Sequence, residues 1–314
     1  YLARCVGSLA AQTLMEAEYI FVDDCSTDHS LALLQELTAS MLPSQVRIVA
    51  LEHNGGVAHA RNAGLDIAQG EYVIHADSDD WTEPDMLERM YRLAKESNAD
   101  IVGCNFVNEY GDRQTTKKQP YADDMHENMR RLLDGRIFPS LWSSLVRHDL
   151  IKNHGITFPD GLNMGEDLLF LVKVYAHAES LVSTSLPLYH YLHRPESLCA
   201  TKSRTGIDAD ITIAGKIEAY LQRQGLQHQY QTEIAYRKFF SKLPLVADFQ
   251  DKAMYKEWKD IYPETHKHIR KYKRLDAKLR LELCLAARGC WLLPRAMSGF
   301  LKWQHSLRER KTKK

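Results

Sequence analysis

The sequence lacks the patterns of an integral membrane protein, a zinc protein or a disulfide-rich secreted domain. No apolar run in it reaches the length that spans a bilayer, and no segment has the composition of a secretory signal. Its six cysteines form no CxxC pair and have no zinc-ligand spacing: Cys5, Cys25, Cys104, Cys199, Cys284 and Cys290. Scattered thiols fit a reducing compartment better than a disulfide framework. We therefore expect a cytoplasmic protein, with residence on the cytosolic face of a membrane as the alternative.

The sequence also has no net charge, but its charges are unevenly distributed. The whole chain holds 41 Lys or Arg residues and 41 acids, whereas fifteen Lys or Arg residues and only three acids follow from Lys267 onward. Apolar residues are interspersed with this basic segment, and such helices can lie on an anionic membrane surface. A solvated helical hairpin or a homodimer contact are the alternatives. We expect no nucleic acid partner, because no recognition motif accompanies the basic residues.

Strand-like and helix-like segments alternate along the first third of the chain. At 314 residues the chain is long enough to bury a substantial core. Short apolar runs predict strands, with helical spacing of apolar residues between them: the strands are expected at 19–22, 46–51, 72–76 and 101–107. This alternation predicts an α/β fold with a mostly parallel, mixed sheet flanked by helices.

The rest of the chain predicts more helices than strands. The segment Thr82-Glu83-Pro84-Asp85 resembles a capping box with proline in the first turn, and predicts a helix that runs to about Ser97. Further elements are predicted at 125–133 (helix), from Glu166 (helix) and at 186–193 (strand). Beyond Thr205 the pattern is almost entirely helical. We expect a sheet domain over residues 1–205 and a helical, basic extension over residues 206–314.

Clustered carboxylates follow two of the predicted strands. Asp23 and Asp24 follow the first, and the segment 77–80 (Asp-Ser-Asp-Asp) follows the third. In an extended backbone Asp77 and Asp79 would point to one side, where they could share Mg²⁺ or Mn²⁺ and leave coordination positions for phosphate oxygens. The alternative is a pair of solvated turns, in which Asp, Ser and Thr are common.

Two further charged motifs have competing interpretations. Arg61 follows an Asn-Gly-Gly turn at the start of a predicted helix; it either pairs with a surface acid or neutralises a carboxylate or a diphosphate in the site. Glu166 and Asp167 open another predicted helix. They are either acids favoured by the helix dipole or a reacting group.

The order of these motifs resembles the family 2 glycosyltransferases, which have the GT-A nucleotide-sugar-binding fold. The resemblance is carried by VDDCSTD at 22–28, HNGGVAHARNAG at 53–64 and GEYVIHADSDDWTEPDML at 70–87. It extends through 141–145, 155–158 and 165–170, and ends with 189–197. It covers roughly two thirds of the chain, and the helical region beyond it shows no such likeness.

The resemblance implies a role for each matching residue in binding the nucleotide sugar. Asp24 would bind the base, with uracil the expected one, and Asp23 would support that loop. Arg61 would lie beside the nucleotide. Arg194 and Ser197 match a family position near the diphosphate.

The resemblance also implies a metal site and a catalytic base. Asp79 would be the principal ligand of Mn²⁺ or Mg²⁺, Asp77 would contact the metal or the ribose, and Asp80 would lie near the nucleotide sugar. Asp167 would be the general base. One family feature is absent: the apolar first strand, which would be central in the sheet, is not in these 314 residues.

The expected function is therefore inverting, metal-dependent transfer of a sugar from a UDP-sugar to a saccharide or lipid-linked acceptor in cell-surface glycan synthesis. A nucleotidyltransferase is a weaker alternative, because no Gly/Arg-rich phosphate loop is visible near the start of the chain. A catalytically silent nucleotide-sugar-binding or scaffold protein is the alternative outside the enzymes.

Overall fold

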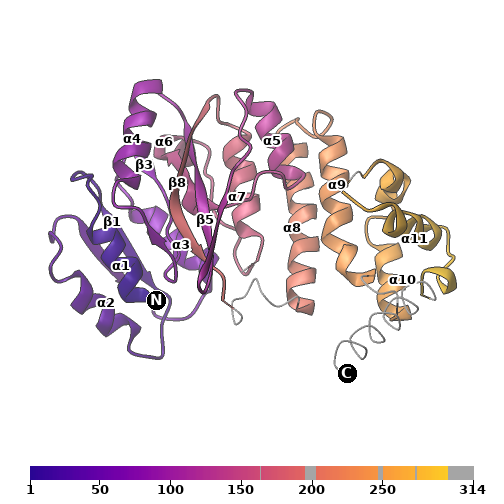
Figure 1. The fold of residues 1–314 in the computed structure, drawn as a ribbon, viewed down its shortest axis with the longest axis horizontal. Coiled ribbons are helices and arrows are strands. Elements are labelled where there is room, and N and C mark those ends of the chain that lie inside the picture. The colour runs from indigo at the N-terminus through magenta and orange to yellow at the C-terminus, as the bar shows by residue number, and fades with distance from the viewer. Residues whose placement is uncertain (163, 195–202, 247–249, 273, 296–314) are drawn as a thin grey trace. The chain divides into compact units, whose positions relative to one another are not determined.

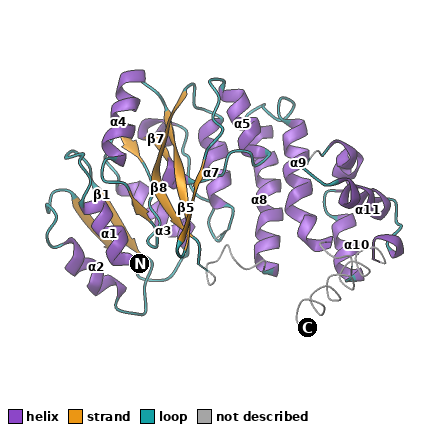
Figure 2. Ribbon diagram, viewed as in Figure 1, coloured by secondary structure: helices purple, strands orange, loops and turns teal. Residues whose placement is uncertain are grey.

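The computed structural model describes residues 1–162, 164–194, 203–246, 250–272 and 274–295. The chain divides into two units, residues 1–202 and residues 203–314. The first unit contains the sheet and the second is helical (Figure 1, Figure 2). Each unit is described by itself.

The first unit alternates helices and strands. In chain order they are α1 Leu2–Ala10, β1 Tyr19–Asp23, α2 Ser30–Thr38, β2 Val46–Ala50, α3 Val57–Ile67, β3 Tyr72–Val73, β4 Trp81–Thr82, α4 Met86–Ser97, β5 Ile101–Tyr110, β6 Arg113–Lys117, α5 Met125–Leu133, the 3-10 helix η1 Leu141–Ser143, β7 Ser144–Arg147, α6 His148–Asn153, α7 Glu166–Tyr175 and β8 Leu181–Leu192.

The strands form two sheets. The larger has the order β3-β7-β5-β8-β4, with β6 paired to β5, and the smaller consists of β1 and β2. β1–β2 and β5–β8 are parallel, whereas β3–β7, β4–β8, β5–β6 and β5–β7 are antiparallel. The predicted mixed α/β sheet is confirmed, but among the described strands it is less parallel than expected. The four strands predicted first do not share one sheet, because β1 pairs only with β2 in the described part of the chain.

The core of the first unit lies between β5, β8 and α4. β5 is buried along almost its whole length, as expected for a strand covered on both faces, and α4 and α7 lie on either side of it (Figure 1). The buried residues of α4 are Met86, Met90 and Ala94, one helical turn apart. Full burial of each methionine stabilises the fold by about 1.5–3 kcal/mol.

Two local predictions in this unit are wrong in detail. The third strand ends at Val73 rather than 76, because its pairing with β7 covers only Tyr72 and Val73. The predicted capping box does not form: Thr82 belongs to β4, and α4 begins at Met86 with Asp85 as its N-cap. Thr82 instead accepts a hydrogen bond from Gln12 (3.0 Å), so a tertiary contact uses the side chain that would have capped the helix.

The second unit is a helical assembly with its own core. It contains α8 Arg204–Arg223, α9 Gln231–Lys242, η2 Leu243–Val246, α10 Lys252–Asp260, η3 Pro263–Lys271 and α11 Ala277–Ala287. Phe239, Trp258 and Leu283 are fully buried in that core. No helix in the described ranges is both long and apolar enough to cross a bilayer.

Candidate active site

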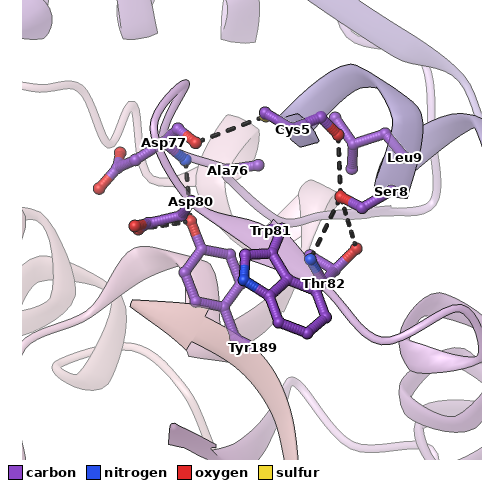
Figure 3. Close-up of a pocket in the computed structure, with 9 residues that line it drawn as sticks. All are labelled: Cys5, Ser8, Leu9, Ala76, Asp77, Asp80, Trp81, Thr82 and Tyr189. Carbon is purple, nitrogen blue, oxygen red and sulfur yellow. Dashed lines mark hydrogen bonds between the residues drawn. The ribbon is translucent and has the colours of Figure 1, made fainter. Parts of the chain in front are cut away.

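Residues 77–80 form a turn that is tied to β8 by the hydroxyl group of Tyr189 and by the N–H of Leu192, which donates to Oδ1 of Asp80 (2.8 Å). The N–H of Asp80 donates to the carbonyl of Asp77 (3.1 Å), so the segment is not the extended one that the Asp-x-Asp spacing predicts. The hydroxyl of Tyr189 accepts from the N–H of Asp77 (3.0 Å) and donates to Oδ2 of Asp80 (3.0 Å), as Figure 3 shows. Both ends of the turn are therefore tied to the same side chain.

A pocket of about 120 Å³ lies between this turn, α1 and β4. It is lined by Cys5, Ser8, Leu9, Ala76, Asp77, Asp80, Trp81, Thr82 and Tyr189 (Figure 3). It has almost no room even for a water molecule, so a nucleotide sugar would not fit inside. The pocket is part of the packing that fixes the turn.

One guanidinium group joins the acidic turn to the start of α7. Arg61 Nη2 lies 3.1 Å from Oδ1 of Asp77, and its Nη1 lies 2.8 Å from Oε1 of Glu166. The same Nη1 forms an ion pair with Oδ1 of Asp167. The Arg61 side chain is only 11% exposed. The structure thus brings together three motifs that lie far apart in the sequence.

The position of Arg61 follows from how α3 begins and what it packs against. Gly56, the N-cap of α3, has φ +82°, a conformation that favours glycine. The Arg61 guanidinium lies over the ring of Phe158 (5.5 Å), which is stacked on Phe170 of α7 (4.2 Å). The Asn62 side chain holds the backbone of Phe158 through two hydrogen bonds. Its Oδ1 accepts from the Phe158 N–H (2.8 Å), and its Nδ2 donates to the Phe158 carbonyl (3.2 Å).

Burial and the neighbouring charges shift the pKa values of the charged groups in this cluster. Burial by itself lowers the pKa of Arg61, but the neighbouring carboxylates, Asp167 foremost, outweigh burial and raise it. Burial raises the pKa of Asp167 well above its usual range, and Arg61 acts in the opposite direction. The pKa of Asp77 is raised by burial and lowered by Arg61 in the same way. A carboxyl group that is basic yet held beside a fixed cation is suited to accept a proton.

The second carboxylate of the acidic turn has a different arginine as partner. Asp79 Oδ2 is ion-paired with Nη2 of Arg194, which follows β8. Arg4 of α1 donates to the backbone carbonyl of Asp79 (3.4 Å) and lies 3.8 Å from Oε2 of Glu109. Burial raises the pKa of Asp80 to about 8, and its two carboxyl oxygens accept from the Tyr189 hydroxyl and the Leu192 N–H.

The acids at the end of β1 are occupied by backbone groups. The two carboxylate oxygens of Asp24 accept from the N–H groups of Gly55 (2.9 Å) and Gly56 (2.7 Å). Asp23 is buried and accepts from the N–H of Ser26 (3.2 Å). Asp24 therefore fixes the turn that opens α3, whose second turn carries Arg61. No direct contact links Asp24 to the acidic turn among the described residues.

The oxygen donors of the acidic turn fit a divalent cation of the hard type. Mg²⁺ and Mn²⁺ are commonly bound by one or two carboxylates, with substrate phosphates completing the coordination. Asp77 and Asp79 supply two carboxylates, and the described residues contain no cluster of three or more potential metal ligands. A cation here would complete its shell with water or phosphate oxygens.

The predicted site residues divide into three sets in space. Arg61 joins Asp77 and Asp167, Arg194 joins Asp79, and Asp24 contacts the start of α3. Ser197 lies outside the described residues. The sequence analysis did not single out Arg4. A basic residue in the first turn of a helix is disfavoured by the helix dipole, so its presence there could have indicated a functional contact. Tyr189 is buried in the core, and its hydroxyl group nevertheless contacts the turn.

The aromatic residues near the site are mainly structural. Trp142 is buried and stacks on Tyr189 (4.3 Å) within the core. Trp81 stacks on His190 (3.4 Å). His190 lies between Glu83 (2.8 Å) and Glu109 (2.9 Å), as expected for a histidine satisfied by its neighbours.

The fold is of the GT-A class, as predicted from the sequence. The solved structure of Staphylococcus aureus TarS residues 1–349 in complex with UDP-GlcNAc matches 97% of this chain and 88% of that chain, with a TM-score of 0.70. Its sequence identity to this chain is 22%, so this likeness shows the fold.

Sequence comparison gives the family. The model of glycosyl transferase family 2 matches residues 1–155. EpsH of Bacillus subtilis (strain 168), named as a glycosyltransferase, is 30% identical over 241 residues, which span 74% of this chain and 69% of EpsH. The poly(ribitol-phosphate) beta-N-acetylglucosaminyltransferase TarS of Staphylococcus aureus (strain MW2) is 30% identical over 202 residues, 62% of this chain and 34% of TarS. The chain belongs to glycosyltransferase family 2, and the family predicted from its motifs is confirmed.

Proposed function

We propose that this glycosyltransferase moves a sugar from a UDP-sugar, with inversion, to a saccharide or lipid-linked saccharide in cell-surface glycan synthesis. The observation that carries the proposal is the bridge that Arg61 makes between Asp77 and Asp167. Sugar transfer needs a group that binds the departing diphosphate and a base for the acceptor, one on each side of the anomeric carbon. Asp77, on the diphosphate side, and Asp167, as the base, are the candidates for these two roles, and both contact the Arg61 guanidinium.

The choice of donor and pathway is supported by the relatives. TarS is named as an N-acetylglucosaminyltransferase acting on poly(ribitol-phosphate), and its fragment was solved with UDP-GlcNAc. Because the sequence match spans about a third of TarS, its donor and acceptor are proposals for this chain. Asp24 would bind the base beside the α3 turn that its carboxylate already holds.

The mechanism begins with the acceptor hydroxyl in contact with Asp167. As the hydroxyl oxygen attacks the anomeric carbon, the Asp167 carboxylate takes its proton, and the bond to the diphosphate breaks on the opposite face. Attack opposite to departure inverts the anomeric centre. Arg61 opposes the effect of burial on Asp167 and keeps its carboxyl group aligned during the step, because the guanidinium contacts Asp167 and is itself held by Phe158 and two further acids.

The leaving diphosphate gains negative charge, which the acidic turn alone would repel. Asp77 and Asp79 would hold Mn²⁺ or Mg²⁺ there. When bound, such a cation supplies Lewis-acid neutralisation of the charge that develops on the leaving group.

The test is turnover of the protein with a panel of nucleotide sugars, read as release of nucleoside diphosphate with and without Mn²⁺. Asp79→Ala should abolish metal-dependent release. Asp167→Asn should lower transfer by about 10²–10⁴-fold, the usual contribution of a general base, with donor binding retained. Asp112→Asn, in an exposed turn, is the matched control. Transfer by Asp167→Asn at the wild-type rate would contradict the base assignment, and donor binding without any release would favour a silent binding protein.

We also propose that the second unit meets an anionic membrane surface, where a lipid-linked acceptor would be found. Several apolar residues of the basic segment pack in the helical core, including Leu283 and Trp291. Leu281, Leu292 and Leu293 remain 54%, 70% and 56% exposed. The other apolar residues of this segment, Phe300, Leu301 and Trp303, lie outside the described residues. Flotation with anionic vesicles should weaken when Leu292 and Leu293 are both changed to Asp, and unchanged flotation would exclude these two as the anchor.

A further inference from the structure

The Asp79 carboxylate, the expected principal metal ligand, is occupied by a cation from the chain itself. Its Oδ2 is ion-paired with Nη2 of Arg194, 115 residues later in the sequence. Both side chains are largely removed from solvent, with 23% of Asp79 and 30% of Arg194 exposed. A guanidinium and a divalent cation cannot both neutralise the same carboxylate oxygen, so the two compete for Asp79.

Another N–H group of Arg194, at Nε, is buried and lacks a hydrogen-bond acceptor among the described residues. The flat face of the guanidinium lies over the ring of Tyr1, 4.8 Å from the centroid. A buried N–H without an acceptor is unfavourable, and an anion brought to this side of Asp79 would supply the missing acceptor. Guanidinium groups bind phosphate oxygens through two parallel N–H groups.

The acidic turn does not depend on Arg194 for its shape. Arg4 holds the backbone carbonyl of Asp79 (3.4 Å), and Tyr189 holds both Asp77 and Asp80. None of these contacts uses the Asp79 carboxylate. Arg194 can therefore leave Asp79 while the turn keeps its conformation.

We propose that Arg194 is an exchangeable counter-ion: it neutralises Asp79 until a divalent cation and a nucleoside diphosphate bind together, and then transfers its N–H groups to the diphosphate. This inference rests on the proposed function and concerns the regulation of its metal site. A divalent cation alone must displace Arg194 and leave the guanidinium unpaired. Cation and diphosphate together satisfy both groups, the cation on Asp79 and the phosphate on Arg194.

The consequence is a positive coupling between the two ligands, which by linkage must be the same in both directions. Removing the guanidinium has opposite effects on them. In Arg194→Met, Mn²⁺ alone should bind about tenfold more tightly than to the wild type, because its competitor is gone. UDP in the presence of Mn²⁺ should bind about tenfold more weakly, because the phosphate loses its partner, and a tenfold change equals about 1.4 kcal/mol.

The experiment measures binding of Mn²⁺, alone and with UDP, to the full chain by calorimetry and by the electron spin resonance signal of free Mn²⁺. Arg89→Met, which removes an arginine from a surface ion pair with Asp85, is the matched control and should bind like the wild type. Arg194→Lys should retain competition for Asp79 but lose part of the UDP affinity. Melting temperatures confirm that each variant is folded.

The outcomes separate this inference from the proposed function. A wild type that binds neither Mn²⁺ nor UDP overturns both. A wild type that binds them with positive coupling, together with an Arg194→Met variant whose Mn²⁺ affinity is unchanged or weaker, overturns the exchange alone. Opposite shifts of the two affinities in Arg194→Met support it.

Discussion

Tyr189 donates a hydrogen bond from its hydroxyl group to Oδ2 of Asp80, and both residues are almost completely buried. The same hydroxyl oxygen accepts from the N–H of Asp77, so one atom of β8 contacts both ends of the acidic turn. This contact links the hydrophobic core, in which the Tyr189 ring stacks on Trp142, to the proposed metal site.

Replacing Tyr189 by Phe should keep the ring packing and remove only this link. We expect the free energy of unfolding to fall by about 1–3 kcal/mol, since two buried polar groups lose a partner, and UDP binding in the presence of Mn²⁺ to weaken. Urea unfolding and UDP titration measure the two effects. Tyr91→Phe removes a hydroxyl that contacts Glu71 at the surface and is the control. Unchanged UDP affinity in Tyr189→Phe would show that the turn keeps its shape without the hydroxyl.

Arg61 should be the most costly charge to remove from the first unit. Arg61→Met leaves Asp77, Glu166 and Asp167 close together without their shared cation. Breaking a buried ion pair by removing one partner typically costs about 3–5 kcal/mol. Urea denaturation should show a loss of that order, with Arg61→Lys intermediate because an ammonium group lacks the planar fork. A loss in Arg61→Met no greater than in Arg89→Met would mean that the three acids are compensated in another way.

Asp24→Asn tests whether Asp24 binds the base in addition to holding the α3 turn. An amide has one acceptor oxygen, so one of the two glycine N–H groups loses its partner and stability should fall by about 1 kcal/mol. If Asp24 also receives a hydrogen bond from uracil, UDP affinity should fall about tenfold, while the binding of Mn²⁺ alone is unchanged. Asp28→Asn, in the same loop, removes a carboxylate charge but keeps an oxygen that can accept from the Ser30 N–H, and should leave UDP binding intact. Equal UDP affinity in both variants would remove Asp24 from the base site.

In the second unit, Lys242 is completely buried, and its ammonium group is surrounded by acceptors. Nζ donates to the carbonyls of Trp258 (3.0 Å) and Tyr262 (3.2 Å), to that of Ile261, and to Nε2 of His266 (2.8 Å). Burial lowers the pKa of Lys242 to about 7, with Glu264 opposing and Lys238 reinforcing the shift. Burial also lowers the pKa of His266 to about 4, so His266 is neutral and can accept.

The lowered pKa makes stability depend on pH in a defined direction. Between about pH 7 and 10.5 the unfolded chain binds a proton at Lys242 that the folded chain does not, so stability from this residue rises with pH. Lys242→Met has no such proton. The difference in unfolding free energy, wild type minus variant, should therefore increase from pH 7 to about pH 9.5. The other titrating groups are common to both proteins, and a pH-independent difference would place the pKa of Lys242 near its ordinary value.

Several features could be predicted from sequence because they depend on residues close together in the chain. Apolar runs and helical spacing gave β1, β2, β5, α3 and α7 with small errors at their ends. Acids directly after an apolar run identified residues 23–24 and 77–80 as candidates. One error arose where a distant residue competed for a side chain: Gln12 binds Thr82, which would otherwise have capped α4.

The sequence by itself determined the family and the kinds of chemical group at the site, since motif order and strand-end acids are properties of the linear chain. Only the tertiary structure decided which charges meet. Arg61 could have faced solvent, and it reaches Asp77 and Asp167 because α3 packs on β1 while Phe158 and Asn62 hold it to the loop before α7. Likewise, Arg194 is paired with Asp79 rather than left at the surface. Ion pairs between residues about a hundred positions apart form only after packing has fixed both backbones, which is why local patterns cannot specify them.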